Sequence, residues 1–388
     1  MAMKRYKIKN MTYIGCIIFL ILLMLTVNNI NGSQQMRQTA ENIMSWQLEN
    51  GGWTKDNPDI FTRTWDGKEK KAKYYQQDGI TPLGTIDNGA TVTELDALAK
   101  AYHQLKDPMI QESFRRGIEF LLLMQYASGG FPQVYPKQDA KVSLYENMVT
   151  YNDDAMINVM YLFQEIIYEK NYYGNGLVED TLRQEVEKAY NKGVEYMVAS
   201  QVHVNDQLTA WGGQHDPNTY ETVQGRIFEP KSLMSKESID IIYFLETVRP
   251  QTAAIRQSVF YAKSWVKATA LENVRYERYG IDGEYFIDNP GHLTWYRFYE
   301  IGTNEPLFAD FDGTVSHSIL DISIERRHGY GWAGSWGKEI YNEQQEALLE
   351  TTENERHILF INTLIGLISI LLILLIIRTK VLIKKKRK

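Results

Sequence analysis

The chain has 388 residues, which is enough for one large domain or two ordinary ones. Its hydrophobic content of 44% is typical of a globular protein, and its formal net charge of −6 argues against a nucleic-acid binder, which usually presents a basic face. The single cysteine, Cys16, lies inside an apolar run, so the sequence excludes intrachain disulfides and a cysteine metal cluster.

The N-terminal region has four basic residues in its first nine positions, followed by an apolar run at 13–27. This order is the layout of a signal peptide. The residues at 27–33 offer only a poor cleavage site, so an uncleaved anchor remains an alternative. We therefore expect residues 1–33 to form a signal peptide or an N-terminal anchor.

An internal repeat of about 77 residues follows. Three predicted helices end in Gln47, Gln125 and Gln201, which are 78 and 76 residues apart, and each helix leads into a glycine-rich turn and then a partner helix. Two helices per repeat predict three helical hairpins. The hairpins can close into a ring with the turns at a common mouth, and an open bundle is the alternative. The aromatic residues expected at that mouth are Trp53, Phe131, Tyr135 and Trp211.

The stretch at 150–163 contains the start of the second partner helix. Asn152 is a good N-cap, and Asp153 and Asp154 follow in the first turn, where the helix dipole favours anions. Asp87 and Asn88 precede the equivalent helix one repeat earlier. A well-capped core helix accounts for these residues, and so does a site where oxygen ligands from two helix starts hold Ca²⁺. The residues alone leave both interpretations open.

Cations fall in several loops that we expect near the same mouth: Lys55 after the first turn, Arg226 in the third repeat, and Arg326 further on. Taken alone, Arg226 is explained equally well as a salt-bridged structural residue, and Lys55 and Arg326 are better explained as solvated surface charges. In a chain of net negative charge, they are also consistent with local binding of the carboxylates of a polyanion.

From about residue 271 the pattern changes to short strands and turns rich in aromatic residues, which predicts a strand-containing flap over the ring. Residues 338–357 are polar and charged, as in a tether. Residues 358–377 form an apolar segment of 20 residues, long enough to span a bilayer, and the basic tail at 378–388 belongs on the cytoplasmic side. The sequence thus predicts an exported domain at 34–337, held at the cell surface by a C-terminal membrane helix.

Eight motifs occur in order over roughly residues 36–336. They are Trp46-Gln-x-x-x-Gly-Gly-Trp53, Thr85-Ile-Asp-Asn-Gly-Ala-Thr91, Gly129-Gly-Phe-Pro-Gln-Val-Tyr135, Tyr151-Asn-Asp-Asp-Ala-Met156, Gln214-His-Asp-Pro217, Arg226-x-Phe-Glu-Pro230, Trp295-Tyr-x-Phe-Tyr299 and Glu325-Arg-Arg-x-Gly-Tyr-x-Trp332. Together they resemble the family ten polysaccharide lyases, which are pectate lyases.

The resemblance implies a mainly α fold: an (α/α)₃ toroid of three helical hairpins with a smaller strand-containing C-terminal flap, to which the terminal membrane segments are added. It also implies a pectate lyase that cleaves polygalacturonate by β-elimination with the help of Ca²⁺ and leaves 4,5-unsaturated ends. We expect a monomer whose partners are pectin and the membrane, with no nucleic acid.

The resemblance also assigns roles to residues. It makes Arg226 the Brønsted base. Because arginine normally stays protonated, this role requires surroundings that favour the neutral form, and it fits a high-pH optimum. It makes Asp87, Asn88 and Asp153 metal ligands. The expected substrate contacts are Lys55, Asp154, His215, Arg297 and Arg326.

Two other functions remain open. A glycoside hydrolase could use Asp87 and Asp153 as its acid and base, and a surface module could bind pectin without cleaving it. Arg226 and the two acidic helix starts argue against the binding module. Phe311 stands where the resemblance leads us to expect an arginine, which predicts either weaker affinity for highly charged pectate or a preference for methylated or mixed uronates.

Overall fold

A computed structural model describes residues 32–55, 58–138, 145–281 and 283–343. Most of the N-terminal segment predicted at 1–33 and the whole membrane segment predicted at 358–377 lie outside these ranges. None of the helices within them is both long enough and apolar enough to cross a bilayer. Residues 338–343, at the start of the predicted tether, are helical, and Ile340 and Tyr341 are buried against the domain.

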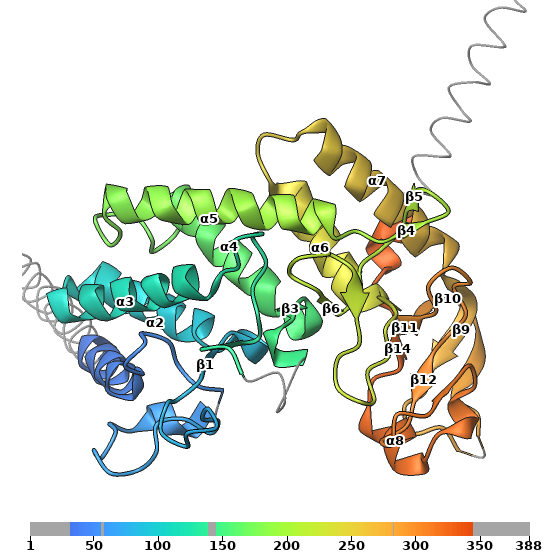
Figure 1. Ribbon diagram of the computed structural model, residues 1–388, viewed down its shortest axis with the longest axis horizontal. Helices are drawn as coiled ribbons and strands as arrows, with labels where there is room; N and C mark the ends of the chain where they lie inside the picture. The colour runs from blue at the N-terminus through green and yellow to red at the C-terminus, as the bar shows by residue number, and fades with distance from the viewer. Residues whose placement is uncertain (1–31, 56–57, 139–144, 282, 344–388) are drawn as a thin grey trace, which may run out of the picture.

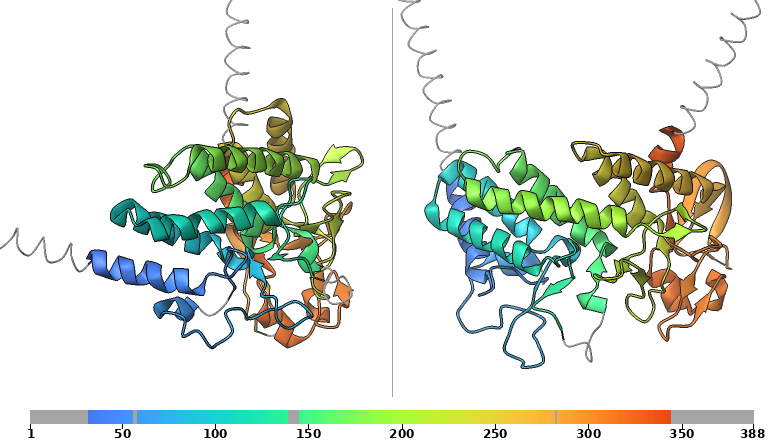
Figure 2. Two further views of the ribbon diagram at one scale, coloured as in Figure 1. Left: turned by 60° about the vertical axis from the view of Figure 1, so that its left-hand side comes forward. Right: turned by 45° about the horizontal axis from the view of Figure 1, so that its top comes forward.

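Three pairs of helices dominate the structure, and each pair packs against the next. They follow one another from one end of the molecule to the other in Figure 1, and Figure 2 shows the same succession from two other sides. A further helix at 32–46 precedes them. The pairs are α2 (Val92–Leu105) with α3 (Pro108–Met124), α4 (Ala155–Ile167) with α5 (Asp180–Ala199), and α6 (Ser235–Thr247) with α7 (Ala253–Ala268).

Short strands join the two ends of every helical pair. The strand before the first helix pairs antiparallel with a strand that follows the second helix, so the repeated unit is β-α-α-β. The strand pairs are β1 (Gly84–Thr85) with β2 (Val134–Tyr135), β3 (Val149–Thr150) with β6 (Gln214–His215), and β8 (Leu233–Met234) with β11 (Phe298–Tyr299). Two further short strands are β7 (Thr222–Val223), beside β6, and the hairpin of β4 (His203–Val204) with β5 (Gln207–Leu208).

The predicted mainly α (α/α)₃ toroid, with strands confined to a C-terminal flap, is therefore wrong. The fold combines α-helices with strands that occur from residue 84 to residue 334, and every helical repeat contains a strand ladder. These strands are two residues long, too short to show the alternation of apolar and polar residues that identifies a strand in a sequence. The glycine and aromatic residues of these short strands therefore look like turn sequences.

The C-terminal region carries the longest strands and a second, smaller apolar core that includes Phe298, Phe308 and Trp332. Its main sheet has three strands, and a separate hairpin and a short helix complete it. The elements are β9 (Leu271–Tyr276), β10 (Phe286–Tyr296) and β14 (Ala333–Gly334) in the sheet, β12 (Phe308–Ala309) with β13 (Val315–Ser316), and α8 (Ile324–Gly329).

The glutamines that mark the repeat share one structural task. Each Nε2 donates one hydrogen bond to the loop that follows it and another to a carbonyl of the next outer helix, so each glutamine fixes a turn and ties two helices together. Gln47 donates to Gly51 and Ser113, Gln125 to Gly129 and Ala189, and Gln201 to Thr209 and Ser258, at 2.7–3.0 Å.

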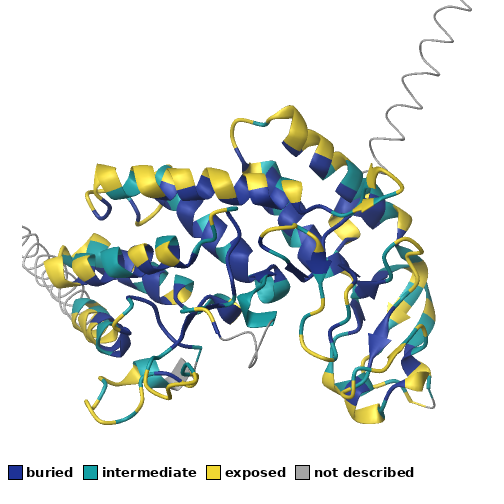
Figure 3. Cartoon of the chain, in the orientation of Figure 1, coloured by how far each residue is buried: buried dark blue, intermediate teal, exposed yellow. Residues whose placement is uncertain are grey.

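The aromatic residues of these turns are part of the core. Trp53, Phe131 and Trp211 are fully buried, and Tyr135 is half-buried. Figure 3 shows the buried residues of the helices and of the loops between them in dark blue. The indole nitrogens of Trp53 and Trp211 donate to helix carbonyls at 2.9 and 2.7 Å, so the rings pack inward and still satisfy their N–H groups. The expectation that these rings line a mouth is wrong for the three buried residues.

Candidate active site

One cleft collects residues from all three repeats. Lys55, Asp87, Asp153 and Arg226 all line it, although they are far apart in the sequence. The strand ladder β1–β2 and the turns before α2 and α4 form much of its wall. The structure thus brings the predicted base and two of the three predicted metal ligands to one place.

Two matching turns present the acidic residues. The 3₁₀ turns η2 (Asp87–Gly89) and η4 (Asn152–Asp154) lie against each other, and each contains a left-handed residue, Asn88 at φ 50° and Asp153 at φ 53°. Asn152 does not cap α4 through its side chain, because α4 begins only at Ala155. Asparagine and aspartate tolerate this backbone better than other non-glycine residues, which explains why they occupy both turns.

Asp87 is held by its neighbours. Its Oδ2 pairs with the Nζ of Lys55 at 2.5 Å, and its backbone N–H donates to the Thr85 hydroxyl at 3.0 Å. The Lys55 side chain remains 39% exposed, so the ion pair lies at the open side of the cleft. Lys55 is therefore placed to contact a bound anion.

Arg226 is paired with Glu229. The Nη2 of Arg226 lies 2.5 Å from the Glu229 Oε1, and the Arg226 backbone N–H donates to Oε2 at 3.0 Å. The hydrogen bond that Arg226 donates to Glu229 raises the pKa of Arg226 above its ordinary value, although burial opposes this. Burial raises the pKa of Glu229, but the Arg226 hydrogen bond and charge outweigh it and leave that pKa lowered. The pair therefore keeps Arg226 protonated in the ligand-free protein.

The charges in the cleft do not balance. Four carboxylates line it, and the cations among its described lining residues are Lys55 and Arg226, each already paired with one of those carboxylates. A polyanion entering this cleft meets an excess of negative charge, and hard oxygen donors such as these suit Ca²⁺. The residues present therefore fit a bound calcium ion. The four carboxylates are Asp87, Glu146, Asp153 and Glu229.

His215 and Arg326 were expected to contact substrate, but the structure buries both. The His215 Nε2 accepts the Gly212 N–H at 3.0 Å, and its Nδ1 faces the Tyr220 carbonyl at 2.9 Å. Burial lowers the pKa of His215 to about 4, so the ring is neutral. Arg326 is 3% exposed and donates to two backbone carbonyls among aromatic rings. Both side chains serve the fold in this arrangement.

The remaining predicted residues lie beside the cleft and are not among its described lining residues. Asp154 pairs at 3.0 Å with Lys236, which also pairs with Asp240. Arg297 pairs with a buried glutamate behind the second turn. Asn88 is exposed next to Asp87.

The sequence interpretation missed Glu229, which carries the contact with Arg226. Its signal is present in the sequence, because Glu229 carries the opposite charge only three residues from Arg226. It missed Asn152 as a lining residue because Asn152 was interpreted as a helix cap.

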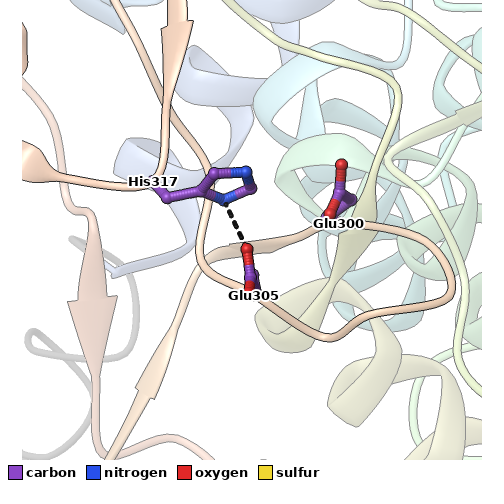
Figure 4. Close-up of side chains that lie close together, drawn as sticks. All are labelled: Glu300, Glu305 and His317. Carbon is purple, nitrogen blue, oxygen red and sulfur yellow. Dashed lines mark ion pairs between the residues drawn. The ribbon is translucent and has the colours of Figure 1, made fainter.

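A group of three possible metal ligands lies elsewhere, near the β12–β13 hairpin. Glu300, Glu305 and His317 offer donor atoms within 4.8 Å of one another. Figure 4 shows the three side chains close together. The His317 Nδ1 faces the Glu305 carboxylate at 3.5 Å and the Pro306 carbonyl at 2.9 Å. Glu305 and His317 are exposed, and none of the three is among the described residues that line the cleft. The group is therefore separate from the cleft.

Comparisons with known proteins agree on one family. Residues 47–341 match the sequence profile of the family described as pectic acid lyase. No curated protein matches the chain. Among solved structures, a family 10 polysaccharide lyase from Cellvibrio cellulosa is 30% identical, with 81% of this chain and 95% of that chain covered and a TM-score of 0.69. An aspartate-to-alanine mutant of such a lyase from Cellvibrio cellulosa, in complex with trigalacturonic acid, is also 30% identical, covers 81% and 96%, and has a TM-score of 0.71.

Proposed function

Because the chain belongs to the pectic acid lyase family and is a polysaccharide lyase, we propose that it cleaves polygalacturonate by Ca²⁺-dependent β-elimination with Arg226 as the base. The observation that carries the proposal is the convergence of Asp87, Asp153 and Arg226 on one cleft. The related lyase in complex with trigalacturonic acid supports a galacturonate chain as the substrate.

We propose that Asp87 and Asp153 hold the calcium ion, with Asn88 as a further ligand at the rim. Bound there, Ca²⁺ would neutralise the uronate carboxylate and make the proton at C5 more acidic. Lys55, at the open side of the cleft, would bind a second carboxylate of the polymer. The excess of carboxylates in the cleft supports a requirement for an added cation.

In the proposed reaction the Arg226 guanidine takes the proton from C5. The electron pair of the C5–H bond forms the C4–C5 double bond, and the glycosidic oxygen leaves C4 and takes up a proton. A base must be deprotonated to act, and the ion pair with Glu229 favours the protonated form. We therefore expect activity to increase at alkaline pH.

The two alternatives are separated by the product and by one variant. β-Elimination creates a conjugated double bond that absorbs ultraviolet light, whereas a glycoside hydrolase using Asp87 and Asp153 creates new reducing ends without it. An Arg226→Ala variant is expected to bind polygalacturonate without cleaving it. Reducing ends without new absorbance would reject the lyase mechanism, and no cleavage by the wild type would favour the binding module.

We also propose that the enzyme acts outside the cytoplasm and is held at the membrane surface. The support comes from the sequence, where basic residues lie outside the apolar runs at both ends of the chain. Fractionation of cells that express the full chain tests this. We expect lyase activity in the membrane fraction, and we expect protease added outside the cells to remove that activity. Activity confined to the cytoplasm would contradict the proposal.

A further inference from the structure

A buried ion pair lies behind the cleft and joins two distant parts of the chain. Glu237, in the first turn of α6, has a fully buried side chain, and its Oε1 pairs with the Nη2 of Arg297. Arg297 follows β10 and is itself largely buried. Neither is among the described residues that line the cleft.

The pair contacts the cleft through Asn152 and Asp153. The Arg297 Nη2 donates to the Asn152 Oδ1 at 3.2 Å and lies 3.7 Å from the Asp153 Oδ1. The Asn152 Nδ2 donates in turn to the Asp153 Oδ2 at 2.9 Å. One oxygen of the Asp153 carboxylate therefore faces Arg297 itself, and the other accepts from Asn152, which Arg297 also contacts.

Backbone hydrogen bonds hold Arg297 against the start of α6, the helix that carries Glu237. The Ser235 N–H, at the start of α6, donates to the Arg297 carbonyl at 3.1 Å, and the Arg297 N–H donates to the Trp332 carbonyl at 2.7 Å. Asp153 itself has a left-handed backbone, which aspartate tolerates better than most other non-glycine residues.

The pair is poorly suited to a purely stabilising role. The Glu237 Oε2 and the Arg297 Nε are buried and have no hydrogen-bond partner among the described residues. A buried ion pair with unsatisfied atoms on both partners often stabilises a fold less than apolar side chains of the same volume. What the pair does supply is a fixed orientation for the Asp153 carboxylate.

We propose that Glu237 and Arg297 are positioning residues that set the affinity of the cleft for its divalent cation by fixing the Asp153 carboxylate. The proposal rests on the proposed function, in which Asp153 holds Ca²⁺. It also gives Arg297 a different role from the predicted substrate contact, because the guanidinium acts from behind the turn. Removal of such supporting groups typically weakens metal affinity by about 10- to 100-fold.

Glu237→Gln tests the proposal, because the amide keeps the shape of the carboxylate and removes its charge. The Ca²⁺ concentration that gives half-maximal formation of unsaturated product is expected to rise about ten-fold. The maximal rate at saturating Ca²⁺ is expected to stay within about two-fold, since Arg226 is untouched. A general loss of structure would lower the maximal rate and would not produce this separation.

A direct binding measurement gives a second readout. Ca²⁺ is titrated calorimetrically into the Arg226→Ala protein with trigalacturonate bound, so that no cleavage occurs, and a blank titration corrects for Ca²⁺ bound by the free sugar. Adding Glu237→Gln to this protein is expected to weaken Ca²⁺ binding about ten-fold.

Glu246→Gln is the matched control, because Glu246 lies on the same helix and pairs with Lys263 outside the cleft. It is expected to leave the Ca²⁺ dependence unchanged. Arg297→Lys keeps the positive charge but loses the planar guanidinium group with its paired N–H donors. It is expected to shift the Ca²⁺ dependence in the same way as Glu237→Gln. It replaces Glu237→Gln as the test variant if Glu237→Gln does not fold. An unchanged Ca²⁺ affinity in a folded variant, or an equal shift in the control, would overturn the proposal. A wild type that makes no unsaturated product at any Ca²⁺ concentration would instead refute the proposed function.

Discussion

Replacing Glu229 by glutamine is expected to shift the pH dependence of activity toward lower pH. Glu229 stabilises the protonated form of Arg226 through an ion pair at 2.5 Å. Glutamine keeps an oxygen that can accept from the Arg226 backbone and removes the negative charge. The pKa of Arg226 then decreases, so a larger fraction is the neutral base at any given pH.

The size of the shift follows from the exposure of the two side chains. Two unit charges about 4 Å apart interact by about 1 kcal/mol in water and about 4 kcal/mol near a protein surface of lower dielectric constant. Glu229 is 10% exposed but Arg226 is 43% exposed, so solvent screening places the interaction in the lower part of that range. We therefore expect the alkaline increase in kcat/KM to move down by about one pH unit.

The assay is the initial rate of unsaturated product formation on polygalacturonate at saturating Ca²⁺ across a pH series. Glu246→Gln, which removes a carboxylate from a partly exposed ion pair outside the cleft, is the control and is expected to leave the profile in place. A Glu229→Gln enzyme that is active but has the wild-type pH profile would refute Arg226 as the titrating base.

Four further predictions follow from the same structure. Arg226→Lys should reduce kcat by at least about 100-fold with little change in affinity for substrate, because lysine cannot reproduce the guanidine geometry; retention of most activity would identify another base. Burial raises the pKa of Glu94 to about 7, so the charged form of Glu94 destabilises the fold. Glu94→Gln should therefore raise the free energy of unfolding by up to about 3 kcal/mol above pH 7 and by little near pH 4.5. Equal effects at both pH values in chemical denaturation would contradict this. Burial lowers the pKa of His215 to about 4, so the unfolded chain binds the proton more readily than the folded one. The free energy of unfolding should therefore fall by up to about 3 kcal/mol between pH 6.5 and pH 4. A folded His215→Gln variant should not show this fall in chemical denaturation. Phe311 is 54% exposed, and Phe311→Arg should bind fully de-esterified polygalacturonate about five-fold more tightly than the wild type. Phe260→Arg on α7 is the control and should not change the affinity. Equal effects of the two variants in binding assays would argue against a substrate contact at Phe311.

The repeat was visible in the sequence because one glutamine performs the same task three times. Gln47, Gln125 and Gln201 make equivalent pairs of hydrogen bonds, so the spacing of the helices could be predicted. The strands between them could not, because two residues are too few to show a period. That difference is why a purely helical ring was predicted and a β-α-α-β repeat is found.

The cleft was predictable only in part. Asp87, Asp153 and Arg226 lie in distinctive local motifs, and the fold brings them together. His215 also lies in a local motif, on the short strand β6, but its burial depends on distant residues such as Tyr151 that pack against it, which no local pattern reveals. The role of Glu237 could not be predicted for the same reason, because its partner Arg297 is 60 residues away in the sequence.

A crystal structure of the Arg226→Ala protein with trigalacturonate and Ca²⁺ tests the central claim most directly. The account predicts a calcium ion bound by Asp87 and Asp153 on one uronate carboxylate, with C5 of the reacting sugar facing the position that the Arg226 side chain has vacated. A calcium ion bound elsewhere, or a trisaccharide whose C5 atoms all face away from position 226, would contradict it.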